Sequence, residues 1–202
     1  MTLTSIANES REPLVGHLIE KSSDRVVLII HGEQGHKDGL YQAELAEGLP
    51  FTSFRFDLSG NGESEGEFDF GRIIAKHTAD IHAVARHFEN LGYQIFAIIA
   101  YGLGSLSGLK YATTCDKPLA HYINIAAPFD IKEIEVPECT RKENWFQSRS
   151  IKMTSKAFVN GIIHTWSACP KQLVYIPFTG YKMRLSLHIM LPCIPTKYPI
   201  TL

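Results

Sequence analysis

The sequence predicts an α/β protein whose mostly parallel sheet is covered by helices on both faces. Over roughly the first 130 residues, short runs rich in β-branched and aromatic residues alternate with stretches of helical periodicity. This βαβα order is typical of parallel sheets, because parallel strands need a crossover between them. With 202 residues and 45% apolar content, the chain is long enough to bury the core of one domain.

Four apolar runs are predicted as buried strands, because each is short and nearly continuous in its apolar character. They are "RVVLIIH" (residues 25–31), "FTSFRFD" (51–57), "YQIFAIIA" (93–100) and "AHYINIAA" (120–127). Between the second and third runs, apolar side chains recur at helical spacing from Arg72 to Asn90, which predicts an amphipathic helix. Another helix is expected directly after the third strand.

Bulk composition argues against several classes of partner. The formal net charge of -1 gives no electrostatic attraction to nucleic acid or to an anionic membrane. No run of about 18 apolar residues occurs, so no transmembrane segment is expected, and the first residues lack a signal-peptide pattern, so we expect a cytoplasmic protein. The four cysteines have no CxxC spacing and are expected to be reduced thiols. We expect no metal and no cofactor, and the oligomeric state stays open.

Charge is divided unequally along the chain. All 21 acidic residues lie at or before Glu143, whereas residues 144–202 carry only basic charges, seven in number. Prolines also interrupt this tail repeatedly. We therefore expect a partial core over residues 1–143 and an atypical tail over residues 144–202.

Three motifs follow the first three predicted strands. They are "HGEQGHKDG" (residues 31–39, the first loop), "DLSGNGESEG" (57–66, the second loop) and "YGLGSLSG" (101–108). Together they resemble the α/β-hydrolase fold, and in particular its serine aminopeptidase, monoglyceride lipase and cinnamoyl-esterase-like branch. The resemblance covers about residues 13–130 and implies an ancestral ester or lipid hydrolase whose C-terminal strands are missing or replaced.

In the resembling family a nucleophilic serine occupies a sharp strand-to-helix turn, flanked two positions away by small residues. Ala100 and Gly104 match those small residues, and Gly102 occupies the serine position. We call residues 100–104 the elbow. The resemblance also implies that the backbone amides of Glu33 and Leu103 form an oxyanion hole, and that His31 braces the first loop.

Replacements for the missing catalytic groups are scarce in the sequence. Ser105 and Ser107 are expected inside the helix after the elbow and not at its apex. His164 and His188 are the histidines of the tail, and no acidic residue follows Glu143 to orient them. Asp130 matches a family position that is generally not the triad acid, and a turn or capping role is favoured for it.

Two rival interpretations use the same part of the chain. Gly102, Gly104 and Gly108 form a loose dinucleotide fingerprint, but the first strand of a sheet normally carries it. His77, His82 and His87 could suggest a metal site, but a spacing of five turns successive side chains about 140° apart on a helix.

The favoured interpretation is therefore an α/β-hydrolase homologue that has lost its catalytic residues. It would be either a protein that binds an acyl or ester small molecule in the remnant pocket, or a truncated product. The alternative is an unconventional carboxylic-ester hydrolase that uses a serine such as Ser105, or a water positioned by His36 or His121. None of these interpretations implies nucleic acid as a partner.

Overall fold

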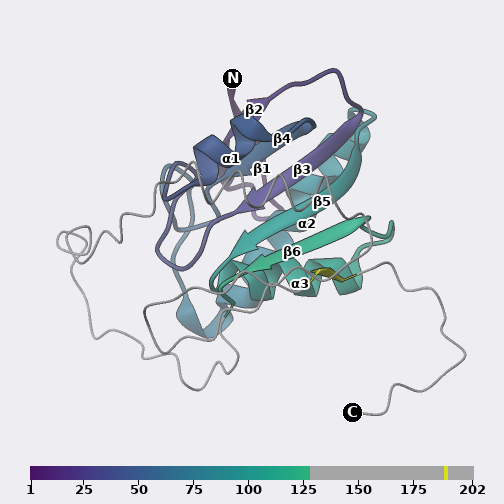
Figure 1. Cartoon of the computed structure of the whole chain (residues 1–202). Coiled ribbons are helices and arrows are strands. Elements are labelled where there is room, and N and C mark those ends of the chain that lie inside the picture. The colour runs from purple at the N-terminus through teal and green to yellow at the C-terminus, as the bar shows by residue number, and fades with distance from the viewer. Residues whose placement is uncertain (128–188, 191–202) are drawn as a thin grey trace, which may run out of the picture.

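The computed structural model describes residues 1–127 together with the short strand at residues 189–190 (Figure 1). Its elements in chain order are β1 (Thr2–Ala7), β2 (Pro13–Ile19), β3 (Arg25–Ile30), α1 (Gln42–Gly48), β4 (Thr52–Phe56), the 3-10 turn η1 (Phe70–Arg72), α2 (Ile73–Asn90), β5 (Gln94–Tyr101), α3 (Gly104–Thr114), β6 (His121–Ile125) and β7 (Ile189–Met190). The remainder of the predicted tail, residues 144–202, lies outside this description apart from β7.

A seven-stranded sheet in the order β1-β2-β4-β3-β5-β6-β7 forms the centre of the fold. The four strands predicted from the sequence, β4, β3, β5 and β6, pair in parallel and confirm the α/β class. Antiparallel pairs extend this centre on both sides, with β1 and β2 at one end and β7 at the other. The sequence analysis did not predict these three outer strands.

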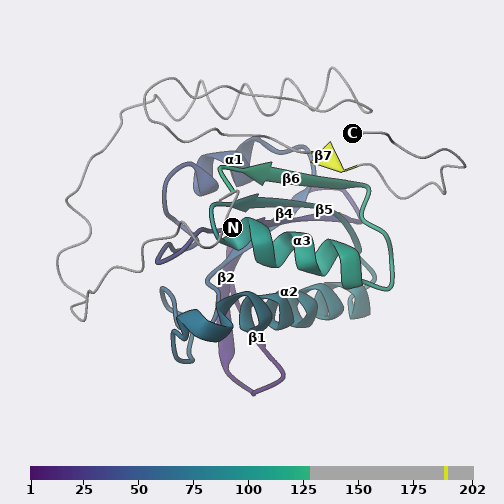
Figure 2. The same ribbon diagram turned by 90° about the horizontal axis from the view of Figure 1, so that it is seen from below.

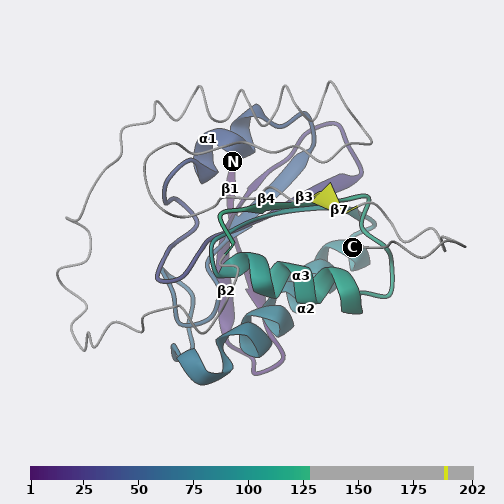
Figure 3. The ribbon, with the colours of Figure 1, turned by 60° about the horizontal axis from the view of Figure 1, so that its bottom comes forward.

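Helices cover both faces of the sheet, as the sequence predicts. Figures 2 and 3 show α1 on one face and α2 with α3 on the other. On β3, Val26, Leu28 and Ile30 point into the core beneath α2 and α3, whereas Val27 and Ile29 point into the core beneath α1. A strand buried on both faces gives a continuous apolar run, so this strand could be predicted from the sequence. Within the described residues no helix is long and apolar enough to cross a bilayer.

Two buried histidines join the second loop to the rest of the structure. The ring of His31 donates from Nδ1 to the Gly32 carbonyl at 2.6 Å and accepts at Nε2 from the Leu58 amide at 3.0 Å. His77, on α2, lies 3.3 Å from the Ser59 carbonyl through Nε2. Burial lowers the pKa of both rings to about 4, so both are neutral at physiological pH. His31 can accept from Leu58 only in this neutral form.

We predict that Gly16→Ala destabilises the protein by about 1–3 kcal/mol, because a methyl group there has no room. A Cβ at this position on β2 would overlap the ring of Phe54 and lie 2.7 Å from Cβ of Phe56. Gly71→Ala is the control, because the nearest atom to its Cβ is 3.4 Å away, and we expect a change within about 0.5 kcal/mol. Urea unfolding followed by circular dichroism measures both. Equal stabilities of the two variants would contradict the packing of β2 on β4.

Stability should also fall as the pH is lowered from 7 to 5. The unfolded histidines have an ordinary pKa near 6.5, whereas the folded pKa of His31 and of His77 is about 4, so the unfolded chain takes up protons first. The stability is fully present above pH 6.5 and decreases as the pH falls towards 4, by up to roughly 3 kcal/mol per histidine. His77→Gln should flatten this dependence in thermal melts, and an unchanged slope in that variant would contradict the contribution of the buried ring.

Candidate functional site

The turn between β5 and α3 has its apex at Gly102. This residue has φ 53°, in the left-handed region that favours glycine. Its amide donates to the Ile125 carbonyl at 2.8 Å, and its carbonyl accepts from the Ser105 amide at 3.1 Å. The chain therefore reverses sharply from the end of a buried strand into a helix, which is the geometry that a nucleophile elbow requires.

The first loop and the elbow touch through glycines. A Cβ at Gly104 would overlap the His31 carbonyl oxygen, and a Cβ at Gly32 would lie 2.8 Å from Cδ1 of Tyr101. A Cβ at Gly102 behaves differently, because its nearest neighbour would be Cα of Gly32 at an ordinary 3.7 Å. Larger side chains are thus excluded around the apex, while the apex itself has space for one.

The two amides assigned to an oxyanion hole lie at this contact. Glu33 follows Gly32 and Leu103 follows Gly102, so each amide is bonded directly to one of the two residues in contact. Within residues 1–127, no hydrogen-bond acceptor is found for either amide. Burial raises the pKa of the Glu33 carboxyl, which has no ion pair or hydrogen bond among the described residues. Among the described residues, both donors are therefore unpaired, and the Glu33 carboxyl next to one of them is half-buried.

The serine candidates lie away from the apex. Ser105 is buried in α3, where its hydroxyl donates to the Ala100 carbonyl at 2.8 Å and its own carbonyl accepts from the Tyr122 hydroxyl. Ser107 is also buried, two residues further along α3. A hydroxyl that is buried and bonded to the backbone cannot reach a substrate, so this placement argues against Ser105 as a nucleophile.

The histidine candidates are separated from the elbow or lie outside the described residues. His121 begins β6 opposite Ala97, about 16 Å along the strand direction from the apex, and its ring packs against Phe96. His36 accepts from the Asp38 amide at 3.3 Å in the first loop and lines the pocket described below. His164, His188 and Asp130 fall in the part of the chain that the structure leaves undescribed.

The helical histidines do not meet. His77 contacts the second loop, His82 lies 3.0 Å from the Thr114 hydroxyl, and His87 packs on Phe88. Among residues 1–127, no three His, Cys, Asp or Glu side chains are placed to share a metal ion.

The glycines of the dinucleotide pattern are explained by packing. Gly104 meets the first loop, and a Cβ at Gly108 would lie 3.1 Å from the Tyr122 ring. Both positions let α3 approach its neighbours closely.

Residues of the second loop serve the internal structure. Asp57 is fully buried and accepts from the Lys37 amide at 2.5 Å and the Glu63 amide at 2.9 Å. Gly62, with φ 54°, is required because a Cβ there would overlap the Asp57 carboxylate. The Ser64 hydroxyl donates to the Asp57 carbonyl at 2.6 Å and accepts from the Val15 amide at 2.8 Å. The Asp-Gly-Ser pattern therefore fixes the conformation of this loop.

Lys37 is a buried charged residue that the sequence analysis missed. Its ammonium contacts Asp57 at 2.9 Å, Asp38 at 3.7 Å and Glu63, although its side chain is only 4% exposed. Burial opposes the charge of Lys37, but the hydrogen bonds and charges of Glu63 and Asp57 outweigh it and raise its pKa. From its position in a polar loop, Lys37 is indistinguishable from a solvated lysine.

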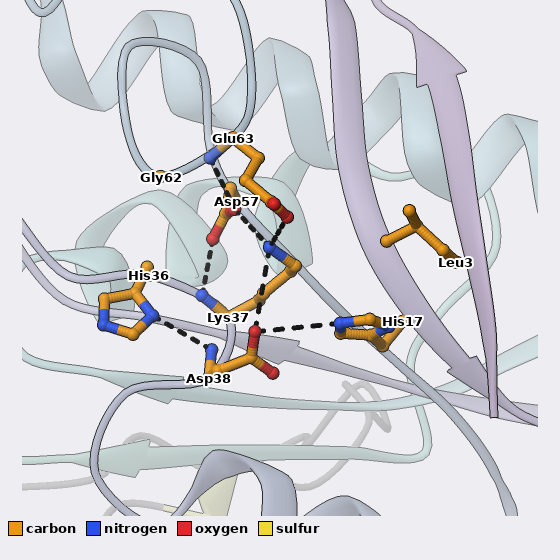
Figure 4. A pocket seen from close by; sticks show the side chains of 8 residues that line it. All are labelled: Leu3, His17, His36, Lys37, Asp38, Asp57, Gly62 and Glu63. Carbon is orange, nitrogen blue, oxygen red and sulfur yellow. Dashed lines mark hydrogen bonds and ion pairs between the residues drawn. The ribbon is translucent and has the colours of Figure 1, made fainter.

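Figure 4 shows the polar pocket of about 380 Å³ that surrounds this lysine. It lies between β1, β2 and the two loops and is lined by Leu3, His17, His36, Lys37, Asp38, Asp57, Gly62 and Glu63. Its one ammonium is shared by three carboxylates, so the charges in the pocket are largely used in holding the first loop to the second.

Comparisons with known proteins agree with this geometry. No family model matches the chain. The uncharacterized protein YDL057W of Saccharomyces cerevisiae is 28% identical over 152 residues, covering 66% of this chain and 46% of the yeast protein. The esterase Pf2001 of Pyrococcus furiosus has a TM-score of 0.58 at 18% identity, covering 65% of this chain and 52% of the esterase. The chain thus spans about half the length of these two proteins.

Two further solved structures share the architecture. A serine hydrolase homologue from Coxiella burnetii has a TM-score of 0.57 at 20% identity and covers 65% of each chain. Est1E from Butyrivibrio proteoclasticus, solved with ferulic acid bound, has a TM-score of 0.55 at 22% identity over 61% of this chain and 52% of Est1E. Together with the sheet order and the turn after β5, these similarities show that the chain has the α/β-hydrolase fold.

Proposed function

We propose that this protein is a non-catalytic member of the ester and lipid hydrolase branch that binds an acyl small molecule at the elbow. The observation that carries the proposal is Gly102 at the apex, with φ 53° and, among the described residues, only an ordinary contact of 3.7 Å to Gly32 for an added Cβ. Without an oxygen at this point no acyl-enzyme can form. A retained oxyanion hole could still bind a carbonyl group.

Two features support binding as the remaining role. The amides of Glu33 and Leu103 have no acceptor within residues 1–127, so a ligand oxygen would satisfy both. In addition, Est1E binds ferulic acid, an acyl compound with a carboxyl group, on a related scaffold. We extend that class of ligand to this chain.

Catalysis is also disfavoured by the residues available to assist it. Residues 144–202 contain no Asp or Glu that could orient His164 or His188. The branch assignment rests on the three motifs after β3, β4 and β5 and on the related esterase structure.

The purified protein should remain unlabelled by a fluorophosphonate probe and should not accelerate hydrolysis of a short-chain nitrophenyl ester above buffer. The reason is that no serine hydroxyl lies at the apex. Intact-mass spectrometry measures labelling, and an active serine esterase serves as the positive control. Stoichiometric labelling mapped to Ser105 or to any other serine would overturn the non-catalytic proposal.

Gly102→Ser should not by itself restore turnover of the nitrophenyl ester. Room exists for the side chain, but a serine without an oriented base stays a poor nucleophile. The ester assay compares the variant with wild type at equal concentration. Multiple turnovers well above buffer would show that an acid and a base are in place after all.

Acyl compounds should raise the melting temperature, and the effect should depend on the Leu103 amide. Leu103 has φ -66°, which a proline can adopt, so Leu103→Pro removes the donor with little change in backbone angle. Leu103→Ala is the matched control, because it loses the same side chain and keeps the amide. We expect the thermal shift to persist in Leu103→Ala and to vanish in Leu103→Pro. An equal shift in both variants would place the ligand elsewhere.

A further inference from the structure

Strand β1 is one end of the sheet, and none of the described residues pairs with its outer side. The strand contains no charged residue, no proline and no bulge, which are features that commonly protect a sheet edge from further pairing. The backbone of β1 is therefore open to an added strand.

The hydrogen bonds of β1 show which of its backbone groups face outward. The Asn8 amide donates to the Glu12 carbonyl at 3.0 Å, so the pair that follows Ala7 and Pro13 is a hydrogen-bonded one. Bonded and non-bonded pairs alternate along an antiparallel ladder, so the odd-numbered residues of β1 are not bonded to β2. These residues are Leu3, Ser5 and Ala7. Their N–H and C=O groups point away from β2, where an antiparallel strand can bond to them.

The backbone of β2 gives the same alternation. Val15 lies opposite Ser5. Its amide donates to the Ser64 hydroxyl at 2.8 Å, and its carbonyl accepts from the Asp57 amide at 2.9 Å. Both partners follow β4, which pairs with the other side of β2, so Val15 is turned away from β1.

Side chains of an added strand would reach the polar pocket of Figure 4. Ile6 lies in the core beneath α2 and α3, so the odd-numbered side chains of β1 project on the opposite face of the sheet. Leu3 is 61% exposed on that face and lines the pocket. A side chain directly opposite Leu3 on an added strand would lie about 5 Å from it. A long side chain at that position can therefore pass over Leu3 into the mouth of the pocket.

Carboxylates are the exposed charges of this region, whereas its cations are buried. The side chains of Asp38 and Glu63 are 42% and 65% exposed. Those of Lys37 and Arg55 are only 4% and 3% exposed. A side chain that enters from solvent thus meets negative charge first, and a lysine or arginine complements it.

A second copy of this chain would not supply that cation from its own β1. If two copies paired through β1, the strand opposite Leu3 would be Thr2–Ala7 again, which has no lysine or arginine. The charge at the pocket mouth therefore favours a different segment as the added strand.

We propose that β1 is a docking edge for an extended segment of another protein. The segment adds as an antiparallel strand and places a lysine or arginine at the carboxylates of Asp38 and Glu63. This surface uses none of the groups of the elbow, so the inference does not depend on the proposed binding of acyl compounds.

The first test measures binding of a fluorescein-labelled synthetic peptide to the full chain by fluorescence anisotropy. The peptide alternates threonine and valine and has one central lysine, and its two controls carry norleucine or glutamate instead. We expect the lysine peptide to bind about fivefold more tightly than the norleucine peptide, and the glutamate peptide to bind most weakly. Equal affinities would contradict the role of the carboxylates, and no binding of the lysine peptide would overturn the proposal. A dimer that forms through β1 in sedimentation without peptide would assign the edge to a second copy instead.

The second test removes one outward N–H group. Ser5→Pro should weaken peptide binding about tenfold, because proline lacks the donor while the bonds of β1 to β2 remain. Ser5→Ala is the matched control and should bind as wild type does. Wild-type affinity in Ser5→Pro would show that the peptide does not pair with β1.

Modified peptides give the same information on the unaltered protein, so the result does not depend on the folding of Ser5→Pro. N-methylation of the lysine and of every second residue from it should abolish binding, because those amides face β1 in an antiparallel pair. N-methylation of the remaining residues should leave affinity unchanged. Equal effects of the two modifications would contradict strand addition.

The third test removes an exposed carboxylate. Glu63→Gln should reduce the preference for the lysine peptide over the norleucine peptide about threefold, while Lys37 stays paired with Asp57. Glu65→Gln makes the same change of net charge on another exposed residue of the second loop and should leave the preference unchanged. Equal losses in the two variants would indicate a general charge effect and would contradict the proposed position of the lysine.

Discussion

The contact between the first loop and the start of α3 is the constraint on which the site depends. His31, Gly32, Gly102 and Gly104 meet there with almost no side-chain volume between them, because a Cβ at Gly104 would overlap the His31 carbonyl and one at Gly32 would press on Tyr101. Because the backbones approach this closely, the Glu33 and Leu103 amides belong to residues bonded directly to two glycines in contact. The arrangement is a property of the backbone, so it persists whether or not the apex carries a side chain.

Buried polar groups hold that contact in place. His31 connects the end of β3 to the second loop as a neutral ring, and Lys37 connects the first loop to Asp57 as a cation shared among three carboxylates. Removing one partner would leave a buried charge or donor uncompensated, which is costly in a protein interior. The polar pocket of Figure 4 therefore lies where the first loop is held to the second.

The backbone at the apex of the elbow favours glycine for a physical reason. A positive φ strains a serine and does not strain a glycine, so Gly102 takes the conformation of the apex without backbone strain. The turn and its contact with the first loop therefore need no side chain at the apex.

The sequence by itself determined the parallel centre of the sheet, because strands buried on both faces leave continuous apolar runs such as residues 25–31 and 93–100. It also determined α2 and the glycine at the apex, since helical periodicity and motif spacing are local signals. It did not show β1 and β2, whose partly exposed residues give a weak pattern, or β7, which pairs with β6 from far along the chain. Only the tertiary structure decided that Lys37 is buried, that the Ser105 hydroxyl is bonded to the Ala100 carbonyl, and that Gly32 lies against Gly102. Each of these features depends on contacts between segments that are distant in sequence. Local sequence patterns do not predict such contacts, because they form only after folding.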